Sequence, residues 1–292
     1  MRKRNWLAIG LAMLALTVLT LAGCGKKEEN NTGVASSSPS QSSSASPSGA
    51  SAGGTPTLDA IKSRGKLVVG VKFDTRLFGL KDPSSGNVEG FDIDIAKGLA
   101  KELLGDESKL ELKEVTSKTR IPMLDNGDID LIIATMTITE ERKQQVDFSD
   151  VYFKAGQSLL VKKGSPIQSV ADIKKGTKVI GVKGSTSVKN IAEKAPDATV
   201  LEFDNYQDAF TALKAGQGDV LTTDNAILYG MASQDSNYEV VGGTFTDEPY
   251  GIAAKKGNAD LVAFVNGYLK KLHDSGEYDK LYEKWIGATP IQ

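Results

Sequence analysis

Two hydrophobic periods alternate along most of this chain. Within 93–103, apolar residues stand at positions 93, 95, 96, 99, 100 and 103, which is the spacing of one helix face. Residues 130–134 contain the run Leu131-Ile132-Ile133, and a short segment that is apolar throughout is typical of a buried strand. Further strands are predicted at 66–71, 110–115, 158–161, 178–182, 219–222 and 250–254, and further helices at 57–64, 121–125, 209–216, 226–232 and 259–285 with a break at Gly276.

Strands that alternate with helices form parallel sheets joined by right-handed crossovers. In such sheets ligands bind beyond the carboxyl ends of the strands. Candidate binding groups are therefore expected just after Val71, Ala134, Val182 and Thr222.

The N-terminus has the pattern of an export signal. Basic residues at positions 2–4 precede an uncharged, mostly apolar run over 6–22, which is short for a membrane span of ~20 residues. Leu21-Ala22-Gly23-Cys24 resembles the lipobox of bacterial lipoproteins, in which the cysteine becomes the lipid-bearing N-terminus. We therefore expect a lipoprotein signal peptide at 1–23 and a protein anchored on the extracytoplasmic side of the cell membrane by lipid on Cys24. The alternatives are an ordinary secretory signal and a single anchoring helix.

Residues 24–56 are rich in Ser, Gly, Ala and Pro. Such a segment has too little apolar surface to fold alone, and we expect a disordered tether. A chain of this kind spans roughly 30 Å root-mean-square. It serves either as a leash towards a membrane partner or as a spacer.

Composition narrows the function classes. The chain has 292 residues, of which 40% are hydrophobic and 25% charged, so residues beyond the tether suffice for two lobes. The net charge is -2, which argues against a nucleic-acid partner. With one cysteine and one histidine, neither a disulfide within the chain nor a cysteine-based or multi-histidine metal site can form. We expect no metal and no cofactor.

Four motifs resemble those of extracellular solute-binding proteins of family 3, which bind polar amino acids for ABC importers. They are Gly90-Phe91-Asp92-Ile93-Asp94-Ile95, Thr135-Met136-Thr137-Ile138-Thr139-Glu140-Glu141-Arg142 followed by Val146-Asp147-Phe148-Ser149, Thr223-Asp224-Asn225-Ala226, and Glu248-Pro249-Tyr250-Gly251-Ile252. The resemblance extends in order from about Thr57 to Pro290. It implies an α/β, periplasmic-binding-protein-like type II clamshell, with two α/β lobes joined by two crossover strands. We expect lobe 1 at 57–153 and 249–292, and lobe 2 at 154–248.

An amino acid ligand carries a carboxylate and an ammonium, and each buried charge needs a partner. Arg142 can hold a carboxylate with two parallel hydrogen bonds, and it stands in the first turn of a helix whose expected N-cap is Thr139. Thr135 and Thr137, just beyond a strand, can add a hydroxyl and backbone groups. The resemblance implies that Arg142 binds the α-carboxylate; the alternative is a surface arginine paired with a glutamate.

Two further segments can contribute to binding the charged groups of the ligand. Asp224 follows a strand and can neutralise the ammonium, as the resemblance implies, although aspartate also suits a helix N-cap. The loop Lys183-Gly184-Ser185-Thr186-Ser187 lies between a strand and a helix and presents backbone N–H groups to an anion. By resemblance, Thr186 and neighbouring N–H groups close on the carboxylate; the alternative is a plain capped loop.

The block Ser117-Lys118-Thr119-Arg120 is similar to that of glutamate- and aspartate-binding members, whose matching serine and arginine hold the distal carboxylate. This resemblance favours glutamate over aspartate or glutamine. The remaining candidates for ligand contact are Lys72 near the distal group, Asp74 near the ammonium, Phe78 over the aliphatic part or simply in the core, and Tyr250.

The resemblance implies a non-catalytic, monomeric binding protein that captures its ligand by lobe closure. Its permease and ATPase must be separate chains, because no P-loop motif occurs. One alternative is a clamshell dehydratase of the cyclohexadienyl dehydratase type, but no nucleophile–base pair stands out, and His273 is expected on the surface. Another alternative is a ligand-sensing receptor domain.

Overall fold

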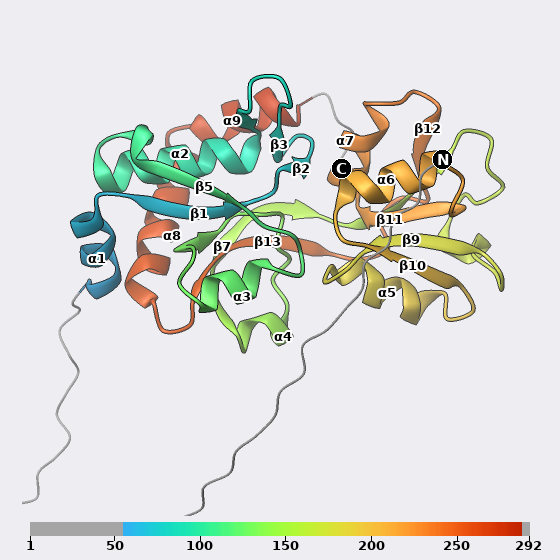
Figure 1. The fold of residues 1–292 in the computed structure, drawn as a ribbon, viewed down its shortest axis with the longest axis horizontal. Coiled ribbons are helices and arrows are strands. Elements are labelled where there is room, and N and C mark those ends of the chain that lie inside the picture. The colour runs from blue at the N-terminus through green and yellow to red at the C-terminus, as the bar shows by residue number, and fades with distance from the viewer. Residues whose placement is uncertain (1–54, 288–292) are drawn as a thin grey trace, which may run out of the picture. The chain divides into compact units, whose positions relative to one another are not determined.

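The computed structural model describes residues 55–287 (Figure 1). The predicted signal peptide (1–23) and the lipid site at Cys24 lie outside the described residues. So does the predicted tether (24–56) as far as residue 54, and Pro56 already begins the first helix.

A five-stranded sheet in the order β5-β1-β6-β13-β7 forms the centre of lobe 1. β1 pairs in parallel with β5 and β6, whereas β13 runs antiparallel to β6 and β7. The strands are β1 (Leu67–Val71), β5 (Leu110–Glu114), β6 (Leu131–Ile132), β7 (Val146–Ala155) and β13 (Glu248–Lys255). The helices are α1 (Pro56–Arg64), α2 (Phe91–Leu104), α3 (Arg120–Asp125), α4 (Glu140–Lys143), α8 (Ala259–Asp274) and α9 (Glu277–Trp285). A small antiparallel sheet adds β2 (Asp74–Thr75), β3 (Gly79–Lys81) and β4 (Val88–Glu89).

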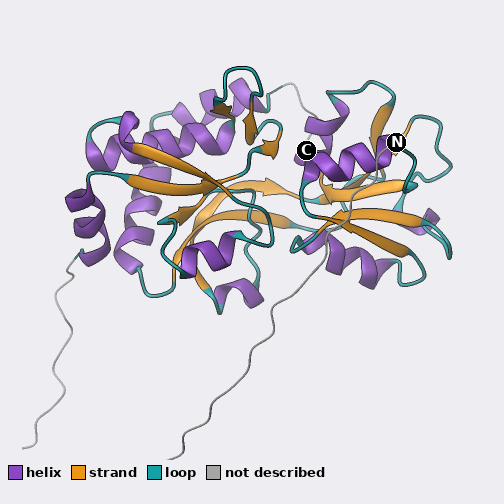
Figure 2. Ribbon diagram, in the orientation of Figure 1, coloured by secondary structure: helices purple, strands orange, loops and turns teal. Residues whose placement is uncertain are grey.

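A second five-stranded sheet, in the order β10-β9-β11-β8-β12, forms the centre of lobe 2. β9 pairs in parallel with β10 and β11, and β8 runs antiparallel to β11 and β12. The strands are β8 (Gln157–Lys162), β9 (Lys178–Val182), β10 (Thr199–Phe203), β11 (Val220–Asp224) and β12 (Tyr238–Val241), and the helices are α5 (Thr186–Lys194), α6 (Tyr206–Lys214) and α7 (Asn225–Ala232). Helices lie on both sides of this sheet (Figure 2).

The chain passes between the sheets twice. β7 ends at Ala155 in the first sheet and β8 begins at Gln157 in the second; the return is made by β13, which begins at Glu248 beside Ala155. Aromatic rings pack along this pair of strands, with the centroids of Phe153 and Tyr250 5.5 Å apart. The predicted fold class, two α/β lobes joined by two crossover strands, is confirmed. The exact lobe boundaries stay a prediction.

Most predicted elements are present, including the break before α9, where Gly276 has a φ of 71°. The strand predicted over 130–134 is shorter, since β6 ends at Ile132. The sequence reading did not identify β7, β10, β12 or the small sheet. β7 was missed because its polar and apolar residues, VDFSDVYFKA, do not alternate strictly.

Candidate functional site

A small cavity lies where strand ends of both sheets approach each other. Its volume is about 200 Å³, counting the part open to solvent. Lobe 1 lines it with groups that follow β5 and β6, and lobe 2 with groups that follow β9 and β10 and with the last residues of β11. The lining residues are Ser117, Arg120, Thr135, Thr137, Arg142, Ser185, Thr186, Tyr206, Thr223 and Asp224.

Arg142 reaches from lobe 1 to lobe 2. The Thr139 hydroxyl accepts a hydrogen bond from its backbone N–H at 3.1 Å, which confirms the predicted N-cap of α4. Its guanidinium donates from Nη1 to the Thr137 carbonyl at 2.8 Å and from Nη2 to the Gly184 carbonyl at 3.1 Å. Burial lowers the pKa of Arg142, and the nearby carboxylate of Asp224 opposes that shift. The group is thus a desolvated cation that needs an anion.

At Gly184, whose carbonyl accepts from Arg142, the backbone of lobe 2 lies close to that of lobe 1. Its φ is 77°, and a Cβ built there would lie 2.9 Å from the Lys118 backbone. Only glycine fits both the conformation and the approach.

Arg120 and Lys72 form a second cationic group in lobe 1. Arg120 is 1% exposed; its Nη1 donates to the Ala134 carbonyl at 2.7 Å, while its buried Nε has no partner among the described residues. Lys72 lies behind the cavity lining, where its Nζ donates to Ser117 Oγ at 3.1 Å and stands 5.0 Å from the Tyr206 ring centroid. Burial lowers the pKa of Lys72 to about 8 and that of Arg120 to about 9. Arg120 thus lines the cavity with one donor, Nε, that makes no hydrogen bond within the described residues.

Asp224 is the carboxylate in the cavity lining. It ends β11 and is the N-cap residue of α7, but its side chain makes no capping hydrogen bond. Its Oδ2 instead accepts from the Tyr250 hydroxyl at 2.6 Å. Burial, followed by repulsion from Glu248, raises the pKa of Asp224 to about 7. A buried carboxylate of this kind favours a cationic ligand group.

The hydroxyls at the start of α5 are already engaged. Thr186 Oγ1 donates to Glu248 Oε2 at 2.8 Å and accepts from Gln157 Nε2 at 3.0 Å. Ser185 Oγ donates to the Val182 carbonyl at 2.7 Å and lies 2.7 Å from Ser187 Oγ. Because no side chain caps α5, its first backbone N–H groups are the donors that can face an anion.

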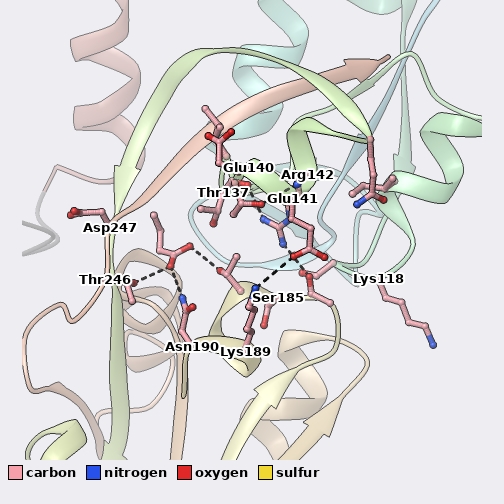
Figure 3. A pocket seen from close by; sticks show the side chains of 18 of the residues that line it. Lys118, Thr137, Glu140, Glu141, Arg142, Ser185, Lys189, Asn190, Thr246 and Asp247 are labelled. Atoms are coloured by element: carbon pink, nitrogen blue, oxygen red, sulfur yellow. Dashed lines mark hydrogen bonds and ion pairs between the residues drawn. The ribbon is translucent and has the colours of Figure 1, made fainter. Parts of the chain in front are cut away.

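The cavity opens into a wider cleft between α4 and α5 (Figure 3). Glu141 on α4 and Lys189 on α5 stand on opposite sides of it, with Oε2 and Nζ 3.8 Å apart. Asn190 donates to Glu248 Oε1 at 3.1 Å, so α5 is also tied to the start of β13. The cleft thus ends at the crossover strands.

Several candidate residues lie outside the cavity lining. Asp74 accepts from the Tyr206 N–H at 2.6 Å and so caps α6 from the other lobe. Phe78 is fully buried among aromatic rings, 5.0 Å from Phe153 between centroids. Lys183 is half-buried, and its Nζ pairs with Asp204 Oδ1 at 2.8 Å. The candidates Lys72, Ser187 and Tyr250 touch lining residues from behind.

Tyr206 and Thr223 line the cavity but were not among the candidates. Tyr206 begins α6 shortly after β10 ends at Phe203, and because β10 was not predicted, no candidate was expected at its carboxyl end. Thr223 stands beside Asp224 in the third motif, so the sequence alone could have identified it as a candidate binding residue.

The described part of the chain offers little other chemistry. No group of His, Cys, Asp or Glu within residues 55–287 is arranged to hold a metal ion. None of the helices in that range has the length and apolar character needed to span a bilayer. His273 is exposed, as predicted, and its ring stacks on Tyr278 at 4.0 Å between centroids.

Known proteins resemble the chain closely. Residues 67–288 match the family model of bacterial extracellular solute-binding proteins, family 3. The ABC transporter glutamine-binding protein GlnH of Bacillus subtilis is 62% identical, over 97% of this chain and 98% of its own. The glutamine-binding protein of Geobacillus stearothermophilus is 63% identical, over 87% of this chain and 95% of its own. An ancestral arginine-binding protein bound to glutamine has 47% identity and a TM-score of 0.72, covering 77% of this chain and 99% of its own.

Proposed function

The chain belongs to the bacterial extracellular solute-binding proteins, family 3, and from this premise we propose that it is the substrate-binding component of an ABC importer whose ligand is glutamine. It is a binding protein, so the dehydratase alternative is not kept. The observation that carries the proposal is the pairing of Arg142 from lobe 1 with Asp224 from lobe 2 around one cavity. Opposite charges so placed can hold the carboxylate and the ammonium of one amino acid.

The sequence block around Arg120 favoured glutamate as the ligand. We propose glutamine instead, because of the charges that surround Arg120. The expectation of glutamate treated Arg120 as a cation without a counterion. Asp92 is fully buried nearby; burial raises its pKa to about 7, and the cations of Lys72 and Arg120 are among the groups that oppose this shift. Asp74 likewise opposes the lowering of the Lys72 pKa. Since carboxylates already offset these cations, the ligand side chain has no need to bring a charge. A neutral amide oxygen can accept from Arg120 Nε, and two relatives more than 60% identical to this chain are glutamine-binding proteins by name.

Calorimetry of the mature protein, stripped of ligand by unfolding and refolding, tests the ligand. We expect glutamine to bind at least about tenfold more tightly than glutamate, because an added buried charge costs more than 1.4 kcal/mol. Arginine is the third ligand to compare. Tighter binding of glutamate or arginine would overturn the choice of glutamine while leaving an amino acid importer in place. Absence of binding to any of the twenty amino acids would overturn the function.

The membrane attachment is proposed on the sequence of residues 1–24. Lipid on Cys24 holds a monomer outside the cytoplasmic membrane, within reach of a separate permease and ATPase. Mass spectrometry of the mature protein should find a diacylglyceryl-modified Cys24 as the first residue. An unmodified cysteine, or a Cys24→Ser variant that stays on the membrane, would contradict this attachment.

A further inference from the structure

Asp92 belongs to the first sequence motif but does not line the cavity. Its carboxylate is 0% exposed. Oδ2 accepts from the backbone N–H of Thr135 at 3.1 Å, and Oδ1 accepts from the Tyr152 hydroxyl at 2.9 Å. One carboxylate thus joins the start of α2 to the turn that follows β6 and to the crossover strand β7.

The peptide unit between Ala134 and Thr135 is held at both of its polar atoms. Its carbonyl accepts from Arg120 Nη1 at 2.7 Å and its N–H donates to Asp92. Thr135 has a φ of 45°, in the left-handed region that a β-branched residue rarely adopts. Such a conformation persists only where the surroundings hold it, and these two hydrogen bonds fix the orientation of the peptide.

The turn fixed in this way forms one wall of the cavity. Thr135 and Thr137 both line it, and the Thr137 carbonyl orients Arg142. If the 134–135 peptide rotated, Arg120 would lose its carbonyl partner and the Thr135 side chain would move. The geometry of both cavity cations therefore depends on this turn.

We propose that Asp92 is a positioning residue for ligand binding, which acts through Thr135 to hold the turn 135–137 in its binding shape. Tyr152 orients the Asp92 carboxylate from the crossover strand. The proposal rests on the binding function proposed above, because it concerns the same cavity.

The test is a double-mutant cycle read by calorimetry with glutamine. Glycine adopts a left-handed φ without strain, so Thr135→Gly removes the need for the clamp. We expect Asp92→Ala to weaken binding about tenfold in the parent but about threefold or less in the Thr135→Gly background. Asp92→Asn should restore the affinity to within about threefold of the parent, because its amide can bond both Thr135 N–H and the Tyr152 hydroxyl.

A matched pair of tyrosine variants controls for general loss of packing. Tyr152→Phe should weaken binding about threefold, whereas Tyr268→Phe, a buried tyrosine of α8 in the same lobe, should leave it unchanged. An equal loss from Asp92→Ala in both backgrounds, or parental affinity in Asp92→Ala, would overturn the proposal. Should Asp92→Ala not fold, equal affinity of the two tyrosine variants would overturn it.

The proposed binding function and the proposed role of Asp92 can fail independently of each other. Parental binding of glutamine tests the function alone. If the parent binds another amino acid, the same cycle is run with that ligand, and the ratio of affinities between variants still decides the role of Asp92.

Discussion

The two lobes bring opposite charges to the cavity and hold them differently. Lobe 1 supplies Arg120 and Arg142, whose guanidinium groups each donate to a carbonyl of lobe 1 itself, at 2.7 and 2.8 Å. Lobe 2 supplies Asp224, whose partner, the Tyr250 hydroxyl, comes from the crossover strand β13. Arg120 is therefore oriented within lobe 1, and Arg142 is held by a carbonyl of lobe 1 while it also reaches the Gly184 carbonyl of lobe 2. The anion is oriented by a residue of the crossover strand.

This difference indicates an order of events. Lobe 1 can hold the ligand carboxylate before the lobes meet, because its donors are already placed. We propose that Asp224 and the N–H groups of α5 engage the ligand only when the lobes close around it. A ligand that contacts both lobes only in the closed form shifts the equilibrium towards that form.

The largest expected loss of ligand affinity follows from removing Arg142, the lobe 1 cation that is already oriented without a ligand. Arg142→Ala should weaken glutamine binding about a thousandfold, because truncating one partner of a buried charge pair costs about 4 kcal/mol. Arg142→Lys should recover only part of this, since an ammonium cannot form the two parallel hydrogen bonds. Calorimetry measures both, and a ligand-free melting temperature close to that of the parent verifies the fold. A loss of tenfold or less in Arg142→Ala would show that Arg142 does not hold the carboxylate.

Removing the anion of lobe 2 should have a smaller effect. Asp224→Asn keeps the shape and an acceptor for Tyr250, and should weaken glutamine about a hundredfold through loss of a buried charge partner. The matched ligand is the analogue of glutamine that lacks the α-ammonium. Its affinity should change about threefold or less, because it has no cation for Asp224 to neutralise. An equal loss for both ligands would show that Asp224 does not bind the ammonium.

A change of pH should separate ligand binding from folding. Burial raises the pKa of Asp224 and of Asp92 to about 7, far above the unfolded value of about 4. As the pH falls from 7 to 5.5, the folded state takes up protons that the unfolded state does not. The unfolding free energy of the ligand-free protein should therefore rise, by on the order of 1–2 kcal/mol.

Glutamine affinity should fall over the same interval, by about tenfold, because a protonated Asp224 cannot neutralise the ammonium. Carboxylates with a lowered pKa, such as Asp147, titrate below this window. Chemical denaturation and calorimetry at each pH give the two slopes. Slopes of the same sign would contradict the assignment of Asp224 as a buried, titrating partner of the ligand.

Sequence reasoning located the charges better than it described their surroundings. Arg142, Arg120 and Asp224 all line the cavity, because each follows a strand or begins a helix where periodicity and the four motifs pointed. Hydrophobic periodicity does not indicate which side chains of a loop point away from the cavity. Lys183 lies beside the cavity-lining residues in sequence but pairs with Asp204 on the surface.

The proposed preference for glutamine rests on contacts that no pattern in the sequence reveals. In the sequence, Asp92 is not distinguished from other aspartates in the first turn of a helix. Its burial near Lys72 and Arg120 is apparent only from the structure. The same holds for the left-handed backbone of Thr135, since threonine gives no signal for it. Charge balance and backbone strain arise from long-range packing, so they were beyond a reading of local pattern.

The smallest expected loss of ligand affinity is at Thr186. Its hydroxyl takes part in a hydrogen-bond network with Glu248 and Gln157 and carries no charge. Its hydroxyl proton goes to Glu248 and its lone pair accepts from Gln157, so a ligand carboxylate meets the backbone N–H of this residue and not its hydroxyl. Thr186→Val keeps the shape and the N–H, and should change glutamine affinity about fivefold or less, through the hydrogen bonds that Glu248 and Gln157 lose. A hundredfold loss would show instead that the hydroxyl turns to the ligand on binding, and that lobe 2, like lobe 1, grips the carboxylate with a side chain.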